Sequence, residues 1–407
     1  MSGFTVVKAL NRALHETMAA DPGVLVLGED VGALGGVFRV TEGLSEAFGD
    51  QRVIDTPLAE SGIIGTAIGL ALRGFRPVAE IQFDGFVFPG FDQIVNQLAR
   101  YRSRTHGRQG LPVVIRIPFG GGIGGVEHHS ESPEAHFMHT PGLHVLSFAC
   151  PQDAHWLLRQ AIACPDPVIL FEPKARYYAK GEVDESGPDL PMCSARIVRP
   201  GRDATLLTYG PMVRTCLDAA QAAAGEGRDV EVVDLRSLAP LDMATIRACA
   251  ERTRRVIVVH EARLTLGPGA EIAAQRRAHR ESEALMRQAM TTVRQRVEPL
   301  LTAIADGAPI TAGMRARARM LEAELRDERR APFFTGTRVI ESARAARIRG
   351  IDVILLDDRG TSGGLTDDAQ KVVIGQAARA LDDARKGQVV IRLLPPRQRP
   401  GLLSIVT

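Results

Sequence analysis

The fold is decided by Val53-Ile54-Asp55-Thr56-Pro57-Leu58-Ala59-Glu60-Ser61-Gly62, where a short apolar strand passes through a Thr-Pro turn into an apolar helix predicted over residues 61–74. Strands and helices alternate on both sides of this stretch, from residue 4 to residue 172. The other strands are also continuous apolar runs, such as Val24-Leu25-Val26-Leu27 and Val168-Ile169-Leu170-Phe171. Such runs, separated by helices, are typical of a parallel sheet covered on both faces. The sequence therefore predicts an α/β fold.

The rest of the chain divides into a linker, a second α/β region and a tail of different character. Residues 181–191 are rich in Pro, Gly and charge, and strands and helices resume from 204 to 260. The tail is rich in Arg and Ala; we predict a long amphipathic helix over 281–305, helices over 314–329, 339–349 and 369–385, and strands over 353–356, 389–394 and 402–406. We therefore expect domains over 1–180, 192–274 and 275–407.

Composition excludes several classes of protein. The chain has 407 residues, of which 45% are hydrophobic and 24% charged, as in ordinary globular proteins. The longest uncharged apolar stretch, 63–72, is shorter than a bilayer span, and no charged-then-apolar leader opens the chain, so we expect neither a membrane protein nor a secreted one. Five scattered cysteines without a C-x-x-C pair favour reduced thiols and a cytoplasmic location.

Charge changes sign along the chain. Residues 275–407 contain 24 Lys and Arg against 16 Asp and Glu, whereas residues 1–274 contain 26 against 32. This step supports a domain boundary near residue 275. The basic residues of the tail are interleaved with acidic ones, so the pattern does not indicate nucleic-acid binding.

Three blocks of sequence carry candidate chemistry. Glu60 is the only charged residue between Thr56 and Leu72; it reads either as a buried carboxyl with a raised pKa or as a solvated residue in the first turn of a helix. The block 83–92 holds four phenylalanines, which suit either stacking on a heteroaromatic ligand or core packing. The glycine-rich block 120–134 contains His128 and His129, placed for proton transfer; adjacent histidines do not make a zinc site, and no helix opens behind the glycines as in a dinucleotide fingerprint.

Together with 26–31 and 170–174, these blocks resemble the beta subunit of the thiamine-diphosphate-dependent 2-oxoacid dehydrogenase decarboxylase component. The resemblance covers residues 1–274. It implies two transketolase-like domains with parallel sheets, the second one truncated, followed by an α+β module. The wording of residues 82–89 and 128–134 is similar to branched-chain (2-oxoisovalerate) enzymes, with pyruvate or acetoin dehydrogenase as alternatives.

The resemblance also assigns residues. It implies that Glu60 hydrogen-bonds the aminopyrimidine of the cofactor, that Phe86 stacks near that ring, and that His129 assists acyl transfer to the lipoyl arm. A carboxylic acid at the ring nitrogen favours the imino tautomer that the chemistry requires. The family's structural potassium would match five positions, and Cys164 stands where relatives often have Asp; the positions are Val113, Ala161, Ile162, Cys164 and Asp166.

Partners follow from what the sequence lacks. No Gly-Asp-Gly motif for magnesium and diphosphate occurs here, so the resemblance implies that an alpha subunit supplies that half of the site. It further implies a beta–beta dimer within a heterotetramer, a lipoyl acyltransferase core as partner, and no activity for the chain alone.

The tail leaves a different class of function open. Residues 353–360 and 389–396 faintly resemble the ATP-binding end of bacterial sensor kinases, without a recognisable asparagine helix or paired glycine boxes. Two alternatives of another class therefore stay open: a non-catalytic regulatory or interaction protein, and a signalling ATPase remnant. A fused or frameshifted reading frame is also open.

Overall fold

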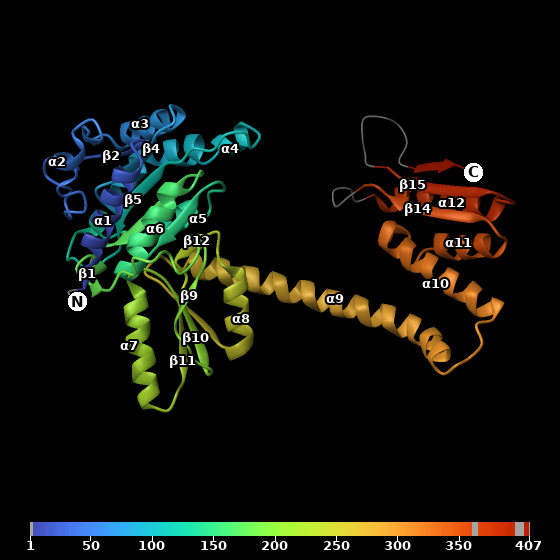
Figure 1. Ribbon diagram of the computed structural model, residues 1–407. Helices are drawn as coiled ribbons and strands as arrows, with labels where there is room; N and C mark the ends of the chain where they lie inside the picture. Colours follow the sequence, from blue (N-terminus) through green and yellow to red (C-terminus); the bar gives the residue numbers. More distant parts are fainter. Residues whose placement is uncertain (1–2, 360–364, 395–402, 407) are drawn as a thin grey trace. The chain divides into compact units, whose positions relative to one another are not determined.

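The computed structural model describes residues 3–359, 365–394 and 403–406 (Figure 1). The chain forms two compact units, Met1–Ala278 and His279–Thr407. The predicted α/β fold is confirmed in the first unit. Gly360, Pro395, Pro396 and Leu402, which belong to the sequence patterns noted in the tail, lie outside the described residues.

A mixed sheet with the order β12-β6-β7-β5-β4-β2-β3 forms the centre of the first domain. All neighbours pair in parallel except β12, which runs antiparallel to β6. The carboxyl ends of the parallel strands therefore meet at one edge. The strands are β2 (Val24–Gly28), β3 (Val53–Asp55), β4 (Arg76–Glu80), β5 (Val114–Phe119), β6 (His144–Ser147), β7 (Val168–Pro173) and β12 (Ser237–Ala239).

Alternate strand residues supply two cores, one on each face of this sheet. Val168 and Leu170 of β7 join the core under α1 (Val6–Ala20) and α6 (Pro151–Ala163), whereas Ile169 and Phe171 face the core that includes α3 (Glu60–Leu72). Helices therefore cover both faces, as predicted (Figure 1). The remaining elements are β1 (Phe4–Thr5), α2 (Leu44–Phe48), η1 (Asp84–Gly90), η2 (Gln93–Leu98), α4 (Tyr101–Arg104), η3 (Glu127–His129), α5 (Glu134–Met138), η4 (Lys174–Arg176) and β8 (Lys180–Gly181).

The segment that follows η1 is not a regular α-helix. It consists of a π-helical turn at η2 and the short α4. The π-helical turn buries Ile94 and Leu98 against the α3 side of the sheet, so its wider winding serves core packing.

The second domain is a smaller sheet with the order β13-β10-β11-β9. β10 pairs in parallel with β11 and β13, and β9 runs antiparallel to β11. Asp242 caps α8 by accepting a hydrogen bond from the Thr245 amide. The elements are β9 (Arg196–Arg199), β10 (Ala204–Thr208), α7 (Met212–Gly225), β11 (Val230–Asp234), α8 (Met243–Thr253) and β13 (Val256–Val259).

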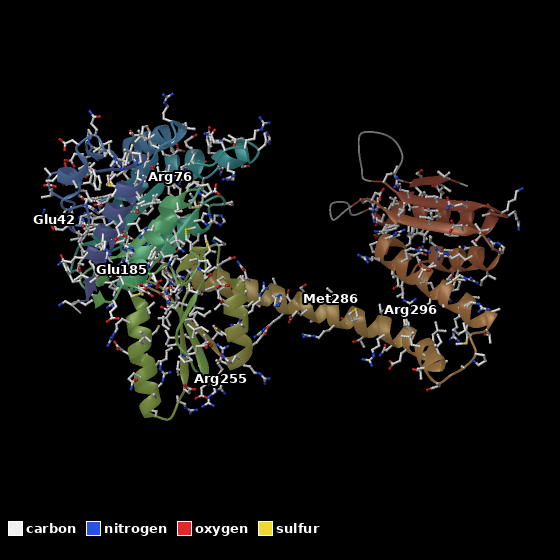
Figure 2. The ribbon with its side chains drawn as sticks, viewed as in Figure 1. Glu42, Arg76, Glu185, Arg255, Met286 and Arg296 are labelled. Carbon is white, nitrogen blue, oxygen red and sulfur yellow. The ribbon has the colours of Figure 1, made fainter. Side chains whose placement is uncertain are left out.

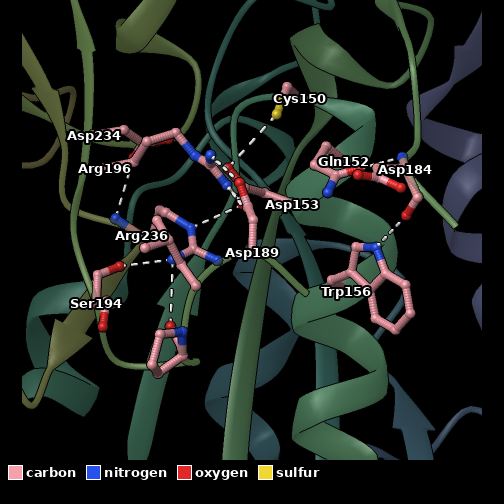
Figure 3. A network of polar contacts seen from close by, with 12 residues as sticks. Cys150, Gln152, Asp153, Trp156, Asp184, Asp189, Ser194, Arg196, Asp234 and Arg236 are labelled. Atoms are coloured by element: carbon pink, nitrogen blue, oxygen red, sulfur yellow. Dashed lines mark hydrogen bonds and ion pairs between the residues drawn. The ribbon is translucent and has the colours of Figure 1, made fainter. Parts of the chain in front are cut away.

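Buried ion pairs join the two domains (Figure 3). Arg236 of the second domain lies 2.9 Å from Asp153 at the start of α6, and Arg196 of β9 contacts Asp153 at 2.8 Å and Asp189 at 2.6 Å. Burial, followed by the charge of Asp153, raises the pKa of Asp234 to about 8. The linker thus runs over a charged seam that fixes one domain against the other.

The second unit has its own sheet and core. β14 and β15 are parallel, β16 is antiparallel to β15, and Phe334, Leu381 and Ile391 lie in a core that the helices cover. The helix α9 (Pro268–Ala305) begins in the first unit and ends in the second. The remaining elements are α10 (Ala312–Arg330), η5 (Pro332–Phe334), α11 (Arg338–Ile348), β14 (Asp352–Asp357), α12 (Asp367–Asp383), β15 (Gln388–Leu393) and β16 (Leu403–Val406). Among the described residues, no helix has the length and apolarity that a membrane span requires.

A buried charge cluster spans three neighbouring strands of the first domain. Arg116 on β5 contacts Glu80 on β4 at 2.6 Å and Glu172 on β7 at 2.7 Å, and the Tyr177 hydroxyl donates to Glu172. Burial raises the pKa of Glu80, and the charge of Arg116 opposes that shift only in part. Each charge therefore depends on the others for its stability.

We expect Arg116→Met to destabilise the first domain by about 3–5 kcal/mol, because two carboxylates would remain buried without a cation. Urea unfolding followed by the fluorescence of Trp156, the single tryptophan, reports on α6 of this domain. Arg214→Met is the matched control: its pair with Asp218 is exposed, and we expect a change within about 0.5 kcal/mol. Equal unfolding midpoints for the two variants would contradict the assignment.

Candidate active site

The candidate site lies where the parallel strands of the first domain end. Ligands of α/β proteins bind at this edge, because the loops that follow the strands converge there. The residues that these loops contribute are Glu29 after β2, Glu60 after β3, Phe86 after β4, His129 after β5 and Lys174 after β7.

Glu60 is the first residue of α3 and is only 7% exposed. The alternative of a solvated residue in the first helical turn is therefore wrong. Burial and the nearby charge of Glu60 raise the pKa of Glu29, so two carboxyl groups share this part of the site. Glu29 therefore holds a proton more readily than an isolated carboxylate does.

Phe86 and His129 lie together, although 43 positions separate them in the sequence. Their ring centroids are 5.3 Å apart, and the Phe83 ring lies 4.4 Å from His129. The His128 ring is 6.0 Å from Phe86. The Nδ1 atom of His129 is buried and has no hydrogen-bond partner among the described residues. The imidazole is thus held by ring contacts, and its buried Nδ1 atom is left without a hydrogen bond from the described residues.

Two features bring these loops together. A Cβ atom at Gly85 would lie 2.3 Å from the carbonyl oxygen of His128, so only glycine allows the Phe86 segment to approach the histidines. Beside it, the fully buried Asp84 contacts Lys174 at 2.6 Å and accepts hydrogen bonds from the Gly85 and Gly120 amides. Burial raises the pKa of Asp84, with Lys174 opposing the shift. This ion pair joins the loop that carries Phe86 to the segment that directly follows β7, and the Gly120 amide ties the loop of His129 to the same carboxylate.

The second domain contacts the same loop. The Tyr209 hydroxyl, at the end of β10, donates to Glu134 Oε1 at 2.5 Å, while Glu134 Oε2 is buried without a hydrogen-bond partner among the described residues. Burial raises the pKa of Glu134 to about 7, and the Tyr209 hydrogen bond opposes that shift. A cavity of about 1140 Å³ opens beside this contact; residues that line it include Phe88, Ser130, His136 and His139 from the first domain and Glu261, Arg263 and Glu271 beyond β13.

The five positions predicted for potassium also lie together, near the start of β5 and the end of α6. The carbonyl of Val113 accepts from the Val168 amide, and that of Ala161 accepts from the Cys164 amide. The guanidinium of Arg76 donates to the carbonyls of Ile162 at 2.8 Å and Cys164 at 3.5 Å, and Asp166 pairs with Arg102. These oxygens suit a monovalent cation, but an arginine already supplies positive charge at two of them.

Sequence reasoning missed part of the site. It did not assign Glu29, the Asp84–Lys174 pair or the Glu134–Tyr209 hydrogen bond. Glu29 and Lys174 each directly follow a buried strand, which was an available signal. Tyr209 had no local signal, because its partner lies 75 positions away.

We expect Glu134→Gln to change how stability depends on pH. The raised pKa means that the folded protein keeps a proton that the unfolded chain releases above about pH 4.5, so this residue lowers stability as pH rises towards 7. As pH rises from 5 to 8, the free energy of unfolding of the glutamine variant should fall by roughly 2–3 kcal/mol less than that of the wild type. Urea unfolding at intervals from pH 5 to pH 8 measures it, with Glu226→Gln, an exposed carboxyl, as control. Parallel pH profiles for wild type and the Glu134 variant would contradict this role.

Comparison with known families matches both domains. Residues 2–180 match the family described as transketolase, pyrimidine binding domain, and residues 194–299 match transketolase, C-terminal domain. A solved structure titled "Split gene transketolase, inactive beta4 tetramer" aligns with a TM-score of 0.55 at 23% identity, over 67% of this chain and 84% of that one. The transketolase-like fold predicted from the sequence is thereby confirmed.

Curated relatives are more similar. The pyruvate dehydrogenase E1 component subunit beta of Leifsonia xyli is 58% identical over 66% of this chain and 80% of its own length. The 3-methyl-2-oxobutanoate dehydrogenase subunit beta of Mycobacterium tuberculosis is 57% identical over 67% and 78%. With these identities over most of the relatives' length, the chain belongs to the family of 2-oxoacid dehydrogenase E1 beta subunits.

Proposed function

We propose that this chain is the beta subunit of a branched-chain 2-oxoacid dehydrogenase decarboxylase component and that it binds the aminopyrimidine half of thiamine diphosphate. The observation that carries the proposal is the buried carboxyl of Glu60 at the strand edge where Phe86 and His129 meet. Bound there, the cofactor supplies a nucleophilic carbon for decarboxylation of the oxoacid.

Glu60 and Phe86 fit the aminopyrimidine. Glu60 is shielded from water and neighbours Glu29, whose pKa is raised, so the pair can donate a hydrogen bond to a ring nitrogen and return the proton. Phe86 is partly exposed and rests against Phe83 and the histidines, which leaves part of its ring available for stacking.

We assign His129 to the transfer of the acyl group to a lipoyl arm. Its imidazole, held against Phe83 and Phe86, can hold or donate a proton at the acyl oxygen or the lipoyl sulfur. The glycine-rich loop that carries it is largely exposed from residue 122 to residue 128, which gives a lipoyl arm of an acyltransferase core access to the imidazole.

An alpha subunit is the partner that we propose for the remainder of the site. The sequence has no Gly-Asp-Gly motif to hold magnesium and diphosphate. The side chains of Leu58, Val126 and Leu266, on or beside the site loops, are largely exposed. Apolar residues in such positions suit burial against a second polypeptide, and a heterotetramer built on a beta–beta dimer would supply it. All five cysteines are free thiols, which supports the cytoplasmic location.

A regulatory role is the second candidate. It rests on the final third of the chain, where a separate unit with its own core follows the catalytic-type domains. Capture of an alpha subunit by the tagged full chain favours the enzyme, whereas failure to capture one on co-expression favours the regulatory protein.

We expect Glu60→Gln, co-expressed with the alpha subunit, to lose at least about 100-fold in oxoacid-dependent dye reduction, because the amide cannot exchange a proton with the cofactor ring. The assembly should remain intact on size-exclusion chromatography. The wild type, assayed with 3-methyl-2-oxobutanoate and with pyruvate, should show the higher kcat/KM with the branched substrate.

Glu42→Gln is the matched control, since Glu42 lies exposed in the same domain (Figure 2), and we expect it to retain activity. Near-normal turnover in Glu60→Gln would refute the role of Glu60. A higher kcat/KM with pyruvate would refute the branched-chain assignment and leave the reaction class in place.

For potassium, we propose that the ion binds at the carbonyls of residues 113, 161, 162 and 164 in competition with Arg76. Arg76→Gln should then gain more thermal stability from KCl than the wild type does, relative to choline chloride of equal ionic strength. At a hundredfold excess over the dissociation constant the gain reaches about 2.7 kcal/mol. Arg73→Gln, an exposed arginine, should behave as the wild type. If KCl has no specific effect on the thermal stability of any of the three proteins, the proposal that potassium binds at these carbonyls is refuted.

A further inference from the structure

Helix α9 carries an apolar stripe with the spacing of a coiled coil. Six apolar residues between positions 286 and 304 follow one another at alternating intervals of four and three: Met286, Met290, Val293, Val297, Leu300 and Ile304. A repeat of 3.5 residues places them along one side of the helix, and this repeat is what a helix needs to pair with another helix along its length. We call these six residues the α9 stripe. All of them belong to the second unit.

The α9 stripe is only partly covered by the described residues of the chain. Met286 is 65% exposed, Met290 61% and Ile304 41%, and the other three side chains are partly exposed. None of the hydrophobic cores formed by the described residues contains a stripe residue. Figure 2 shows Met286 on the long helix. Helices draw most of their stability in water from burying an apolar face, so this one calls for a partner.

The second half of the stripe has the residue types of a two-stranded coiled coil. With Met290, Val297 and Ile304 at the first apolar position of each heptad, Met286, Val293 and Leu300 occupy the second. β-branched residues at the first position with leucine at the second favour two parallel strands, and Val297, Leu300 and Ile304 follow this rule. Pro299 falls on the opposite side of the helix, where its ring does not obstruct the stripe.

The flanking charges decide the direction of pairing. Arg287 and Arg294 flank the stripe on one side and Arg296 on the other. In an antiparallel pair of copies centred on the stripe, Arg294 would meet Arg294 and Arg296 would meet Arg296. In a parallel pair, each flanking residue faces the residue five positions further along the other copy, and no two of these arginines meet. Arg296 then lies beside the exposed Leu301 of the other copy.

Two carboxylates of helix α10 pair with one of the arginines that flank the stripe. Arg296 contacts Glu328 at 2.6 Å and Glu324 at 2.9 Å, both on α10. These carboxylates neutralise Arg296 and hold its guanidinium towards α10. Arg296 is therefore drawn away from the stripe.

We propose that residues 286–304 of α9 form a parallel two-stranded coiled coil with the same residues of a second copy of the chain. This interface is separate from the beta–beta dimer implied by the transketolase-like domains. It gives the chain a means of self-association through its second compact unit, and it does not depend on the proposed enzymatic activity.

Disulfide trapping of the purified full-length protein tests the proposal. Two copies of the Leu300→Cys variant should cross-link to each other through their introduced thiols under mild oxidation, with the bond identified by peptide mapping because five native thiols are present. Gln295→Cys, on the outer side of the same helix, is the matched control and should cross-link at least tenfold more slowly. Equal rates for the two variants would overturn the proposal.

A mixture of Met290→Cys and Leu300→Cys protein tests the direction of pairing. A parallel coiled coil joins two Leu300→Cys chains and keeps the two different variants from joining each other, because positions 290 and 300 lie at different levels along the helix pair. An antiparallel pair brings these two positions to the same level. A disulfide between the two different variants, without any between two Leu300→Cys chains, would overturn the proposal.

A second measurement reads the assembly directly. Val293→Glu with Val297→Glu places charge on partly exposed positions, so the fold should survive, which circular dichroism and the urea midpoint of Trp156 check. Sedimentation should show the assembled mass of the wild type falling to half. An unchanged mass would overturn the coiled coil, whatever the outcome of the activity assays.

Discussion

Parallel strand pairing is the constraint on which the candidate site depends. It brings the ends of β2, β3, β4, β5 and β7 to one edge, so residues from Glu29 to Lys174 become neighbours. The same edge contains Arg116 between two glutamates on adjacent strands, and Asp84 against Lys174. These buried ions stabilise the sheet only while every partner stays in place. The buried charges thus hold the site rigid, but displacement of any one of them leaves another charge buried without a partner.

The second domain completes the surroundings of the histidine loop. Through Tyr209 and Glu134 it contacts the segment that follows His129, and the seam around Asp153 and Arg236 fixes the domain pair. One edge of its sheet ends at β13, where Ile257 is 55% exposed, and the curated relatives extend beyond the matched region by about a fifth of their length. The chain thus contains the part of the second domain that touches the site.

Much of the fold was readable from the sequence, because continuous apolar strands between helices specify a parallel sheet. Strand order was not, since the inner strands of the central sheet are buried on both faces and nothing local selects their neighbours. The burial of Glu60 shows the same limit. Its sequence allowed a solvated first turn or a buried carboxyl, and only packing of α3 against the segment of Phe86 decides between them. The resemblance supplied the roles of Phe86 and His129; their proximity follows from loops that leave adjacent strands β4 and β5.

The tail shows a different relation between pattern and structure. Its long amphipathic helix was predicted correctly, since a periodic pattern sustained over 25 residues overrides local exceptions, including Pro299. What the pattern alone did not reveal is that half of the apolar stripe stays largely exposed. The second unit has its own buried core, which includes Phe334 and Leu381. Its folding therefore does not require the apolar residues of the α9 stripe. Six further apolar residues kept at heptad spacing outside that core serve pairing rather than folding, and a helix that pairs with its own copy needs no other partner to cover them.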